Sequence, residues 1–452
     1  MEISLGTVLI IDVAVLIACV TLLVRFCRIS HSHPIVIYLF FHIYTFTTRM
    51  LAVLMGAPTL FSTLGAVYDK VTEPELVRAG LMADVALIAM TAGWLRAPIS
   101  ARRKIEQRGG TVLPSTPLRF KYVWSVVAVA FPIGCASFAA MTFVPGMQTS
   151  TADALGDWEN SSWITITTTW PGLCLLALIY CYGFRWWLIT PMSLYLLAMS
   201  LQGYHRFRVI IPAILLIQIY LDRKNLRWPP ARLWGAIVAI ALLFYPLKYI
   251  GKMVQEGDSL NDISDTSKEI VLAALTGEHD DQGFMDQMAS AVTLVDEHGK
   301  FFYGKPYVAL LTLPIPRQWW ETKPTPVDHV DEFSVPSRPM REMGMILTHV
   351  GEDYANFGYA GIVIVPFLLA FWLARGYFYA YLNDYYSLAR FTYLLVACNL
   401  IQVFRDGLVS IFMHTCVNMM PLVIIVLLHL FLRGRTSANN PEMALPEAEL
   451  AK

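Results

Sequence analysis

The sequence has little charge, and the charges it has are balanced. Only 15% of its 452 residues are charged, whereas roughly a quarter are charged in an ordinary soluble domain. The formal net charge is zero, so the chain has neither the basic excess typical of nucleic-acid-binding proteins nor the acidic excess of disordered chains. We therefore expect no nucleic-acid partner, and we expect the positions of the charges to be more informative than their number.

Other common features are also missing. No internal repeat is visible. The first apolar run lacks a basic n-region and a small-x-small cleavage site, which argues against a signal peptide, and it is long enough to span a membrane. The seven cysteines form no CxxC pair and lie near no histidine cluster at metal-ligand spacing. We interpret them as small apolar core residues.

Apolar residues, in contrast, make up 56% of the chain and fall into long runs. A spanning helix needs roughly 20 mostly apolar residues. The sequence therefore predicts an all-α, polytopic membrane protein with about eleven spans. These spans are expected at 5–24, 35–56, 77–95, 122–145, 163–182, 186–202, 207–221, 233–250, 358–374, 389–404 and 408–432.

The charges between the predicted spans alternate along the chain, as the positive-inside rule requires. Loops 96–121 and 222–232 are basic and are expected in the cytoplasm. Segments 57–76 and 146–162 are acidic and are expected outside. Eleven spans fit this alternation when the N-terminus is outside and the C-terminus is inside.

This topology divides the chain into four parts. Residues 1–250 carry eight spans, 251–357 form a large outer segment with amphipathic helices, 358–432 carry three spans, and 433–452 form a disordered cytoplasmic tail. A segment as long as 251–357 between two spans usually carries function or forms a lid.

Basic residues gather at two predicted outer ends of spans, where they are unusual. The start of the span at 207–221 contains Tyr204, His205, Arg206 and Arg208. Two arginines at a helix N-terminus oppose the helix dipole, so they either snorkel or bind an anion such as a phosphate. Arg405 lies at the outer turn before the last span, where it either pairs with Asp406 or contacts a ligand.

The outer segment contains a stretch rich in proline and tryptophan, LPIPRQWWETKPTP. Its prolines stiffen the backbone. Trp319 and Trp320 suit either an anchor at the membrane interface or stacking on a sugar ring. Arg317 and Lys323 add two cations beside them.

His349, Glu352 and Asn356 are spaced three and four residues apart. If Met345–Asn356 is helical, the three share one face. A face of this kind at the mouth of a span either holds a general base or is a solvated helix end.

Three other polar features receive a structural interpretation. Arg49 and Asp84 lie within predicted spans and could pair with each other. The stretch His279–Asp281 is more typical of a solvated acidic loop than of a metal site.

Four segments together resemble the Wzy-type O-antigen polymerases, the oligosaccharide repeat-unit polymerases of bacterial inner membranes. The segments are YHRFRVIIPAILLI, GKPYVALLTLPIPRQWWETKP, GEDYANFGYAGI and the RDG turn before the last span, and they cover roughly residues 200 to 430. The N-terminal half is similar in hydropathy only. One departure is His205, which stands where the family more often has a small residue, so its role stays open between catalytic and incidental.

The resemblance implies the multi-span fold of the lipid-phosphosugar glycosyltransferases. It also implies an activity at the periplasmic face of the inner membrane, in which undecaprenyl-diphosphate-linked oligosaccharide units are joined and the lipid diphosphate leaves. No metal and no cofactor is expected, and a chain-length regulator is an implied partner besides membrane lipids. The expected catalytic residues are Glu352, His349, Arg317, Arg206 and Arg405. The expected substrate-binding residues are Arg208, Lys323, His205, Tyr204, Trp319, Trp320, Tyr354 and Asn356.

Three other activities stay open on the sequence. An O-antigen ligase would share the topology and the outer cations. A transporter or flippase for lipid-linked sugars would more often show repeats and matching broken helices. A membrane O-acyltransferase would centre on a buried histidine, such as His414 or His429.

Overall fold

The structure, a computed structural model, is helical wherever it describes secondary structure. It describes residues 3–57, 71–107, 120–143, 167–201, 207–235, 283–312, 347–381 and 388–424. Within these ranges, seven positions are not described: 28, 32, 406, 410, 413, 414 and 417. Outside them, the structure also describes residues 59, 315, 319, 320, 322 and 427. The all-α fold class is therefore confirmed for this part of the chain.

Six helices among the described residues are long and apolar enough to cross a membrane, as expected of a multi-pass membrane protein. They are Leu5–Cys27, Pro34–Leu54, Glu73–Ala97, Val123–Phe143, Thr348–Tyr381 and Leu388–Arg405. Each coincides with a predicted span. Three further predicted spans correspond to the shorter apolar helices α8 (Trp170–Tyr182), α9 (Trp186–Leu201) and α10 (Phe207–Arg223).

The remaining two predicted spans cannot be compared with a helix. Most of 233–250 lies outside the described residues, and 408–432 is described only in pieces. The count of eleven spans therefore stays a prediction. The outer segment also stays a prediction over 251–282 and 323–346, including the stretch His279–Asp281.

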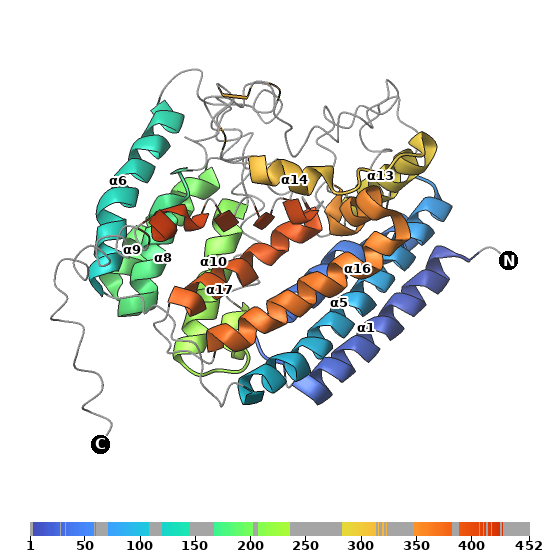
Figure 1. The fold of residues 1–452 in the computed structure, drawn as a ribbon, viewed down its shortest axis with the longest axis horizontal. Helices are drawn as coiled ribbons and strands as arrows, with labels where there is room; N and C mark the ends of the chain where they lie inside the picture. Colours follow the sequence, from blue (N-terminus) through green and yellow to red (C-terminus); the bar gives the residue numbers. More distant parts are fainter. Residues whose placement is uncertain are drawn as a thin grey trace.

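The first group of helices packs around α5 (Glu73–Gln107). Helices α1 (Leu5–Cys27) and α16 (Thr348–Tyr381) lie along it (Figure 1). Close contact with α16 requires a glycine, because a Cβ at Gly93 would lie 2.1 Å from the Phe367 carbonyl oxygen. Small residues let helix backbones approach in this way within membranes.

The second span is not a uniform helix. Helix α2 (Pro34–His42) continues through a π-helical turn, η1 (Ile43–Thr47), into α3 (Thr48–Leu54). A π-helical turn inserts a residue into the helix, and such turns are frequent at functional sites. This turn brings polar side chains of α2 and η1 toward α1.

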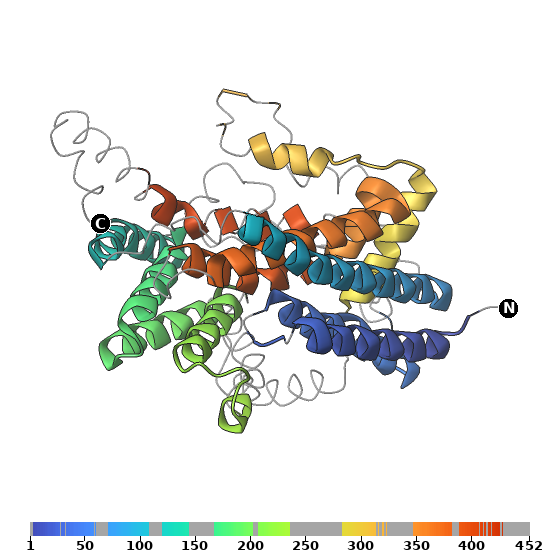
Figure 2. The same ribbon diagram turned by 60° about the horizontal axis from the view of Figure 1, so that its bottom comes forward.

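The second group of helices is separate in sequence and in core. It contains α6 (Phe120–Phe143), α8, α9, α10 and α17 (Leu388–Asn399), with α8 at its buried centre. Its core is continuous along α8, since every residue from Trp170 to Tyr180 is buried. Helix α17 contacts α16 and so joins the two groups (Figure 2).

Two helices of the predicted outer segment pack at one end of the first group. Helix α13 (Phe284–His298) contacts α5 and the start of α16, and α14 (Lys305–Thr312) follows it (Figure 1). The backbone N–H of Leu5 donates to Glu73 at this same end, so α1 and α5 both begin there.

The opposite end joins loops that the sequence predicts to be cytoplasmic. The N–H and Nδ1 of His31 contact the carbonyl oxygen of Arg227. The guanidinium of Arg227 reaches the carbonyl oxygen of Ile29. Among the described residues, the start of α5 and the loop at 222–232 therefore lie at opposite ends of the bundle, and the full alternation stays a prediction.

Candidate functional site

Helix α16 carries the predicted polar face, and this face is inside the protein. His349 and Asn356 are completely buried, and Glu352 is 2% exposed. The prediction that the three share a helix is confirmed, and the alternative of a solvated helix end is wrong. Asp353, one residue off the face, is buried as well. Buried polar groups of this number need partners, and those partners define the site.

His349 is enclosed by two aromatic residues from other helices. The hydroxyl of Tyr38 on α2 lies 2.8 Å from Nε2 of His349. Phe404 packs edge-on against the imidazole, with ring centroids 5.4 Å apart. This enclosure holds the imidazole in one orientation, which suits a positioning residue better than a group that meets a substrate.

Asn356 ties the end of the α16 face to the start of α14. Its Oδ1 accepts the N–H of Gly304 at 3.0 Å, and its Nδ2 donates to the carbonyl oxygen of Glu352. The carbonyl oxygens of Ala355 and Asn356 accept the N–H groups of Phe302 and Tyr303. The predicted sugar-binding role of Asn356 is therefore less well supported than a role in holding two segments together.

These backbone contacts exist because α16 is interrupted at Gly358. Its φ of 63° and ψ of −150° lie outside the helical range, so the turn before it leaves carbonyl oxygens without helical partners. The segment before α14 supplies the missing donors. The predicted span at 358–374 begins at this interruption, and the helix itself begins ten residues earlier, at Thr348.

Asp353 faces Tyr307 of α14. The hydroxyl of Tyr307 donates to Oδ1 of Asp353 at 3.5 Å. Burial, together with the carboxylates of Glu352 and Asp353, raises the pKa of the Tyr307 phenol. The phenol therefore stays protonated at neutral pH and can donate to a carboxylate.

Glu352 lies against the turn that contains Arg405. A Cβ at Gly407 would lie 1.6 Å from Oε2 of Glu352, so a larger residue fits only if the carboxylate moves, and the φ of 79° also favours glycine. Arg405, which is half-buried, stands two residues earlier in the same turn. The third and fourth segments of the resemblance therefore meet at this contact, and Asp406 lies outside the described residues.

Tyr354 points the other way, toward α5 and α13. Its hydroxyl donates to Asp296 at 2.6 Å, and it also accepts a hydrogen bond from Arg78. Partial burial favours a higher pKa for Asp296, but the hydrogen bonds from Arg78 and Tyr354 outweigh it and lower the pKa. Tyr354 is thus part of an ion-pair network, which accounts for it without a sugar.

Of the other predicted residues that the structure describes, Arg208 lies away from this face. Arg208 donates to the hydroxyl of Thr168 at 3.0 Å, within the second group of helices. Trp319 is 82% exposed and Trp320 is 41% exposed, which agrees with either predicted role. The remaining predicted residues lie outside the described part of the chain: Tyr204, His205, Arg206, Arg317 and Lys323.

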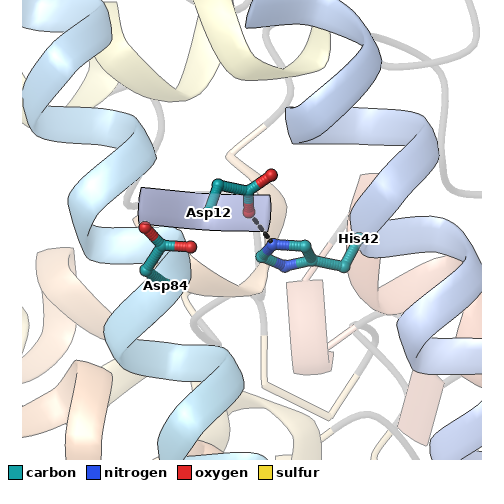
Figure 3. A group of neighbouring side chains, drawn as sticks. All are labelled: Asp12, His42 and Asp84. Carbon is teal, nitrogen blue, oxygen red and sulfur yellow. Dashed lines mark hydrogen bonds and ion pairs between the residues drawn. The ribbon is translucent and has the colours of Figure 1, made fainter. Parts of the chain in front are cut away.

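A second polar cluster lies between three membrane-spanning helices. Nε2 of His42 on α2 lies 2.8 Å from Oδ1 of Asp12 on α1, and Thr47 donates to Oδ2 of Asp12 at 2.6 Å. Asp84 of α5 is 3% exposed and points toward the same place (Figure 3). One ligand atom from each of the three residues lies within 4.8 Å of the others.

The sequence-based pairing of Arg49 with Asp84 is wrong. Arg49 forms a two-point ion pair with Asp286 of α13, through Nε at 3.0 Å and Nη2 at 2.5 Å. Asp84 instead belongs with Asp12 and His42. The signal that could have identified the cluster is the presence of ionisable residues in each of the first three apolar spans.

Comparisons with known proteins add no relative. No protein-family model, no curated protein and no solved structure matches the chain. The fold and the two buried polar sites are therefore the basis for any functional conclusion, together with the four segments quoted above.

Proposed function

We propose that the protein is a glycosyltransferase that joins lipid-diphosphate-linked oligosaccharide repeat units at the outer face of a bacterial inner membrane. The observation that carries the proposal is the contact between Glu352 and the Arg405–Gly407 turn. The Glu352 carboxylate lies against the backbone of Gly407, two residues after Arg405 in the chain. Helix α16, which carries Glu352, also contacts the predicted outer helix α13. A polymerase of this kind needs a carboxylate and a guanidinium, one to accept a proton and one to stabilise a phosphate.

The reaction breaks the bond between the anomeric carbon and the diphosphate oxygen. Negative charge develops on that oxygen as the bond breaks, and cations placed beforehand stabilise it. Arg405 is our first candidate for this role, and the sequence adds Arg206 and Arg317 as further candidates. A guanidinium suits a phosphate because it offers two parallel donors.

The acceptor hydroxyl attacks the same carbon and must lose its proton. In the proposal Glu352 accepts that proton, in line with a general base in an inverting transfer. His349 is less suited, because Tyr38 and Phe404 enclose its ring. Since Glu352 is only 2% exposed, the acceptor reaches it only when the neighbouring turn moves.

The test is a reconstituted assay. Purified protein in liposomes receives undecaprenyl-diphosphate-linked repeat units as the sole substrate, with EDTA, and the products are separated on a gel. A ladder of longer lipid-linked glycans with released lipid diphosphate supports the proposal. A single transfer to a lipid A core acceptor, without a ladder, would identify a ligase instead.

Variants in the same assay separate chemistry from structure. Glu352→Gln keeps the shape of the side chain and should abolish the ladder across the pH range, while thermal unfolding in detergent stays close to that of the wild type. If Glu352→Gln loses the ladder and also unfolds at a clearly lower temperature, Glu352 only positions the turn. Asp222→Asn is the matched control, because Asp222 is a buried carboxylate on α10 that pairs with Arg390 at the opposite end of the bundle.

A second candidate function is transport of the same lipid-linked glycans. The buried cluster of Asp12, His42 and Asp84 favours it, because ionisable residues inside membrane spans are typical of ion-coupled transporters. Movement of labelled lipid-linked sugar across the liposome membrane without a ladder would establish this function and refute the polymerase.

A further inference from the structure

The cluster of Asp12, His42 and Asp84 lies at a depth where charge is costly. Asp12 is seven residues into α1, and Asp84 is eleven residues into α5. At 1.5 Å per residue these positions are about 10 Å and about 16 Å from the helix starts. All three side chains are at most 3% exposed. An unpaired carboxylate at such a site costs several kcal/mol, so the group must either take up a proton or gain a counter-charge.

The described residues supply only part of that counter-charge. His42 can offset one carboxylate, and Thr47 adds a hydrogen bond to Asp12. Among the described residues, Asp12 alone lies close enough to share a proton with Asp84, and neither carboxylate oxygen of Asp84 meets the full geometric criteria for a hydrogen bond. The Asp84 side chain nevertheless points into the group from α5, while His42 approaches Asp12 from another side (Figure 3).

We propose that Asp12, His42 and Asp84 bind one divalent first-row metal ion between α1, α2 and α5. Two carboxylates and one imidazole form a mixed oxygen and nitrogen ligand set that Zn²⁺ and its neighbours accept. Two negative charges are neutralised by one divalent cation, so the site becomes neutral within the membrane. Thr47 fixes the orientation of one ligand from behind, as partners of metal ligands commonly do.

Binding an ion requires small shifts of the three side chains from their present positions. Two ligand atoms bound to one ion by bonds of about 2.1 Å lie at most about 4.2 Å apart. The three ligand atoms of Asp12, His42 and Asp84 lie within 4.8 Å of one another. The 2.8 Å between His42 and Asp12 corresponds to an angle of about 85° at the ion. The ion would replace the proton that now lies between Nε2 of His42 and Oδ1 of Asp12.

The proposed ion is separate from the proposed reaction. It touches none of the residues that face the Arg405–Gly407 turn, and a buried ion exchanges slowly with a chelator. Polymer formation in EDTA and one bound ion per chain are therefore compatible. The two proposals fail independently, because metal content is measured without any glycan.

The test is the metal content of the purified protein, with Zn²⁺ as the probe. Wild-type protein, purified without chelator and equilibrated with Zn²⁺ before desalting, should retain about one equivalent by mass spectrometry. Asp84→Asn and His42→Gln should each lower this at least tenfold. Asp353→Asn is the matched control, since it removes a buried carboxylate outside the cluster and should keep the full equivalent.

Zn²⁺ should also raise the unfolding temperature of the wild type and not that of Asp84→Asn. If Asp84→Asn does not fold, X-ray absorption at the Zn edge of the wild type decides. One imidazole with oxygen ligands supports the site, and sulfur ligands overturn it. Equal Zn²⁺ content in the wild type and both cluster variants, or no retained Zn²⁺ in the wild type, also overturns it.

Discussion

Replacing Gly407 by alanine should disable the candidate site through a single methyl group. The new Cβ would lie 1.6 Å from Oε2 of Glu352 and 2.8 Å from its Cδ. Non-bonded carbon and oxygen atoms need about 3.4 Å, so the carboxylate must move by about 1.8 Å or the turn must open. Either response changes the position of the Glu352 carboxylate relative to the backbone at Gly407.

The cost has two parts. An alanine at a φ of 79° loses about 1–2 kcal/mol to backbone strain. Overpacking a closed interior adds about 1–3 kcal/mol. We expect Gly407→Ala to lower the free energy of unfolding by about 2–5 kcal/mol. We also expect polymer formation to fall by about 100-fold or more, because a displacement of about 1 Å at a reacting group has that effect.

Gly299→Ala separates the two parts. Gly299 has a φ of 60°, and a Cβ there would meet nothing within 4 Å. This variant should therefore show the backbone strain alone, and it should keep its activity. Both proteins are compared by thermal unfolding in detergent and by the ladder assay.

A double variant tests the steric argument directly. Removing the carboxylate in Gly407→Ala/Glu352→Ala should recover the overpacking part of the stability loss, because the methyl group then has space. If Gly407→Ala behaves like Gly299→Ala in both assays, the carboxylate does not lie against the turn, and the candidate site loses its central contact.

Three further outcomes follow from single contacts. Tyr38→Phe removes the hydroxyl that contacts the imidazole of His349 on α16. The free energy of unfolding should fall by about 1 kcal/mol and the ladder should shorten. Unchanged product lengths would argue against a role of Tyr38 in positioning His349. Arg49→Met should cost about 3–5 kcal/mol in thermal unfolding, because it removes the guanidinium from the buried carboxylate of Asp286. Adding Asp286→Leu should restore most of this loss, and no recovery would contradict the ion pair. Partial burial raises the pKa of Asp296, but the hydrogen bonds from Arg78 and Tyr354 outweigh this and lower it. The wild type should therefore have a higher free energy of unfolding than Asp296→Asn above about pH 4, and this difference should disappear as the pH falls further. A difference that grows in acid would show that the pKa of Asp296 is not lowered by folding.

The sequence predicted the features that depend on neighbours along the chain. Apolar runs indicated the helices, and a spacing of three and four residues indicated that His349, Glu352 and Asn356 share a face of α16. Such features are decided within one or two helical turns. For the same reason the start of the predicted span at 358 coincided with the interruption at Gly358.

The contacts between distant helices could not be predicted in this way. Tyr38 and His349 are 311 positions apart, and Arg49 and Asp286 are 237 apart. A membrane-spanning helix is apolar on every side, so its periodicity does not show which face meets a neighbour. The sequence left open whether the α16 face is buried, since a polar face on a single helix looks the same whether water or another helix covers it.

The two buried polar sites are connected through α2. Tyr38 and His42 are four residues apart and therefore lie on one face of that helix, Tyr38 toward His349 and His42 toward Asp12. Apolar packing between membrane helices restrains rotation weakly, because lipid is as apolar as the neighbouring helix. A rotation of α2 by one residue, about 100°, would turn both side chains away from their partners. The contacts of His42 with α1 oppose that rotation, so the cluster between α1, α2 and α5 keeps Tyr38 directed at α16. A polar group between α1, α2 and α5 can thus fix the polar face of α16 without touching it.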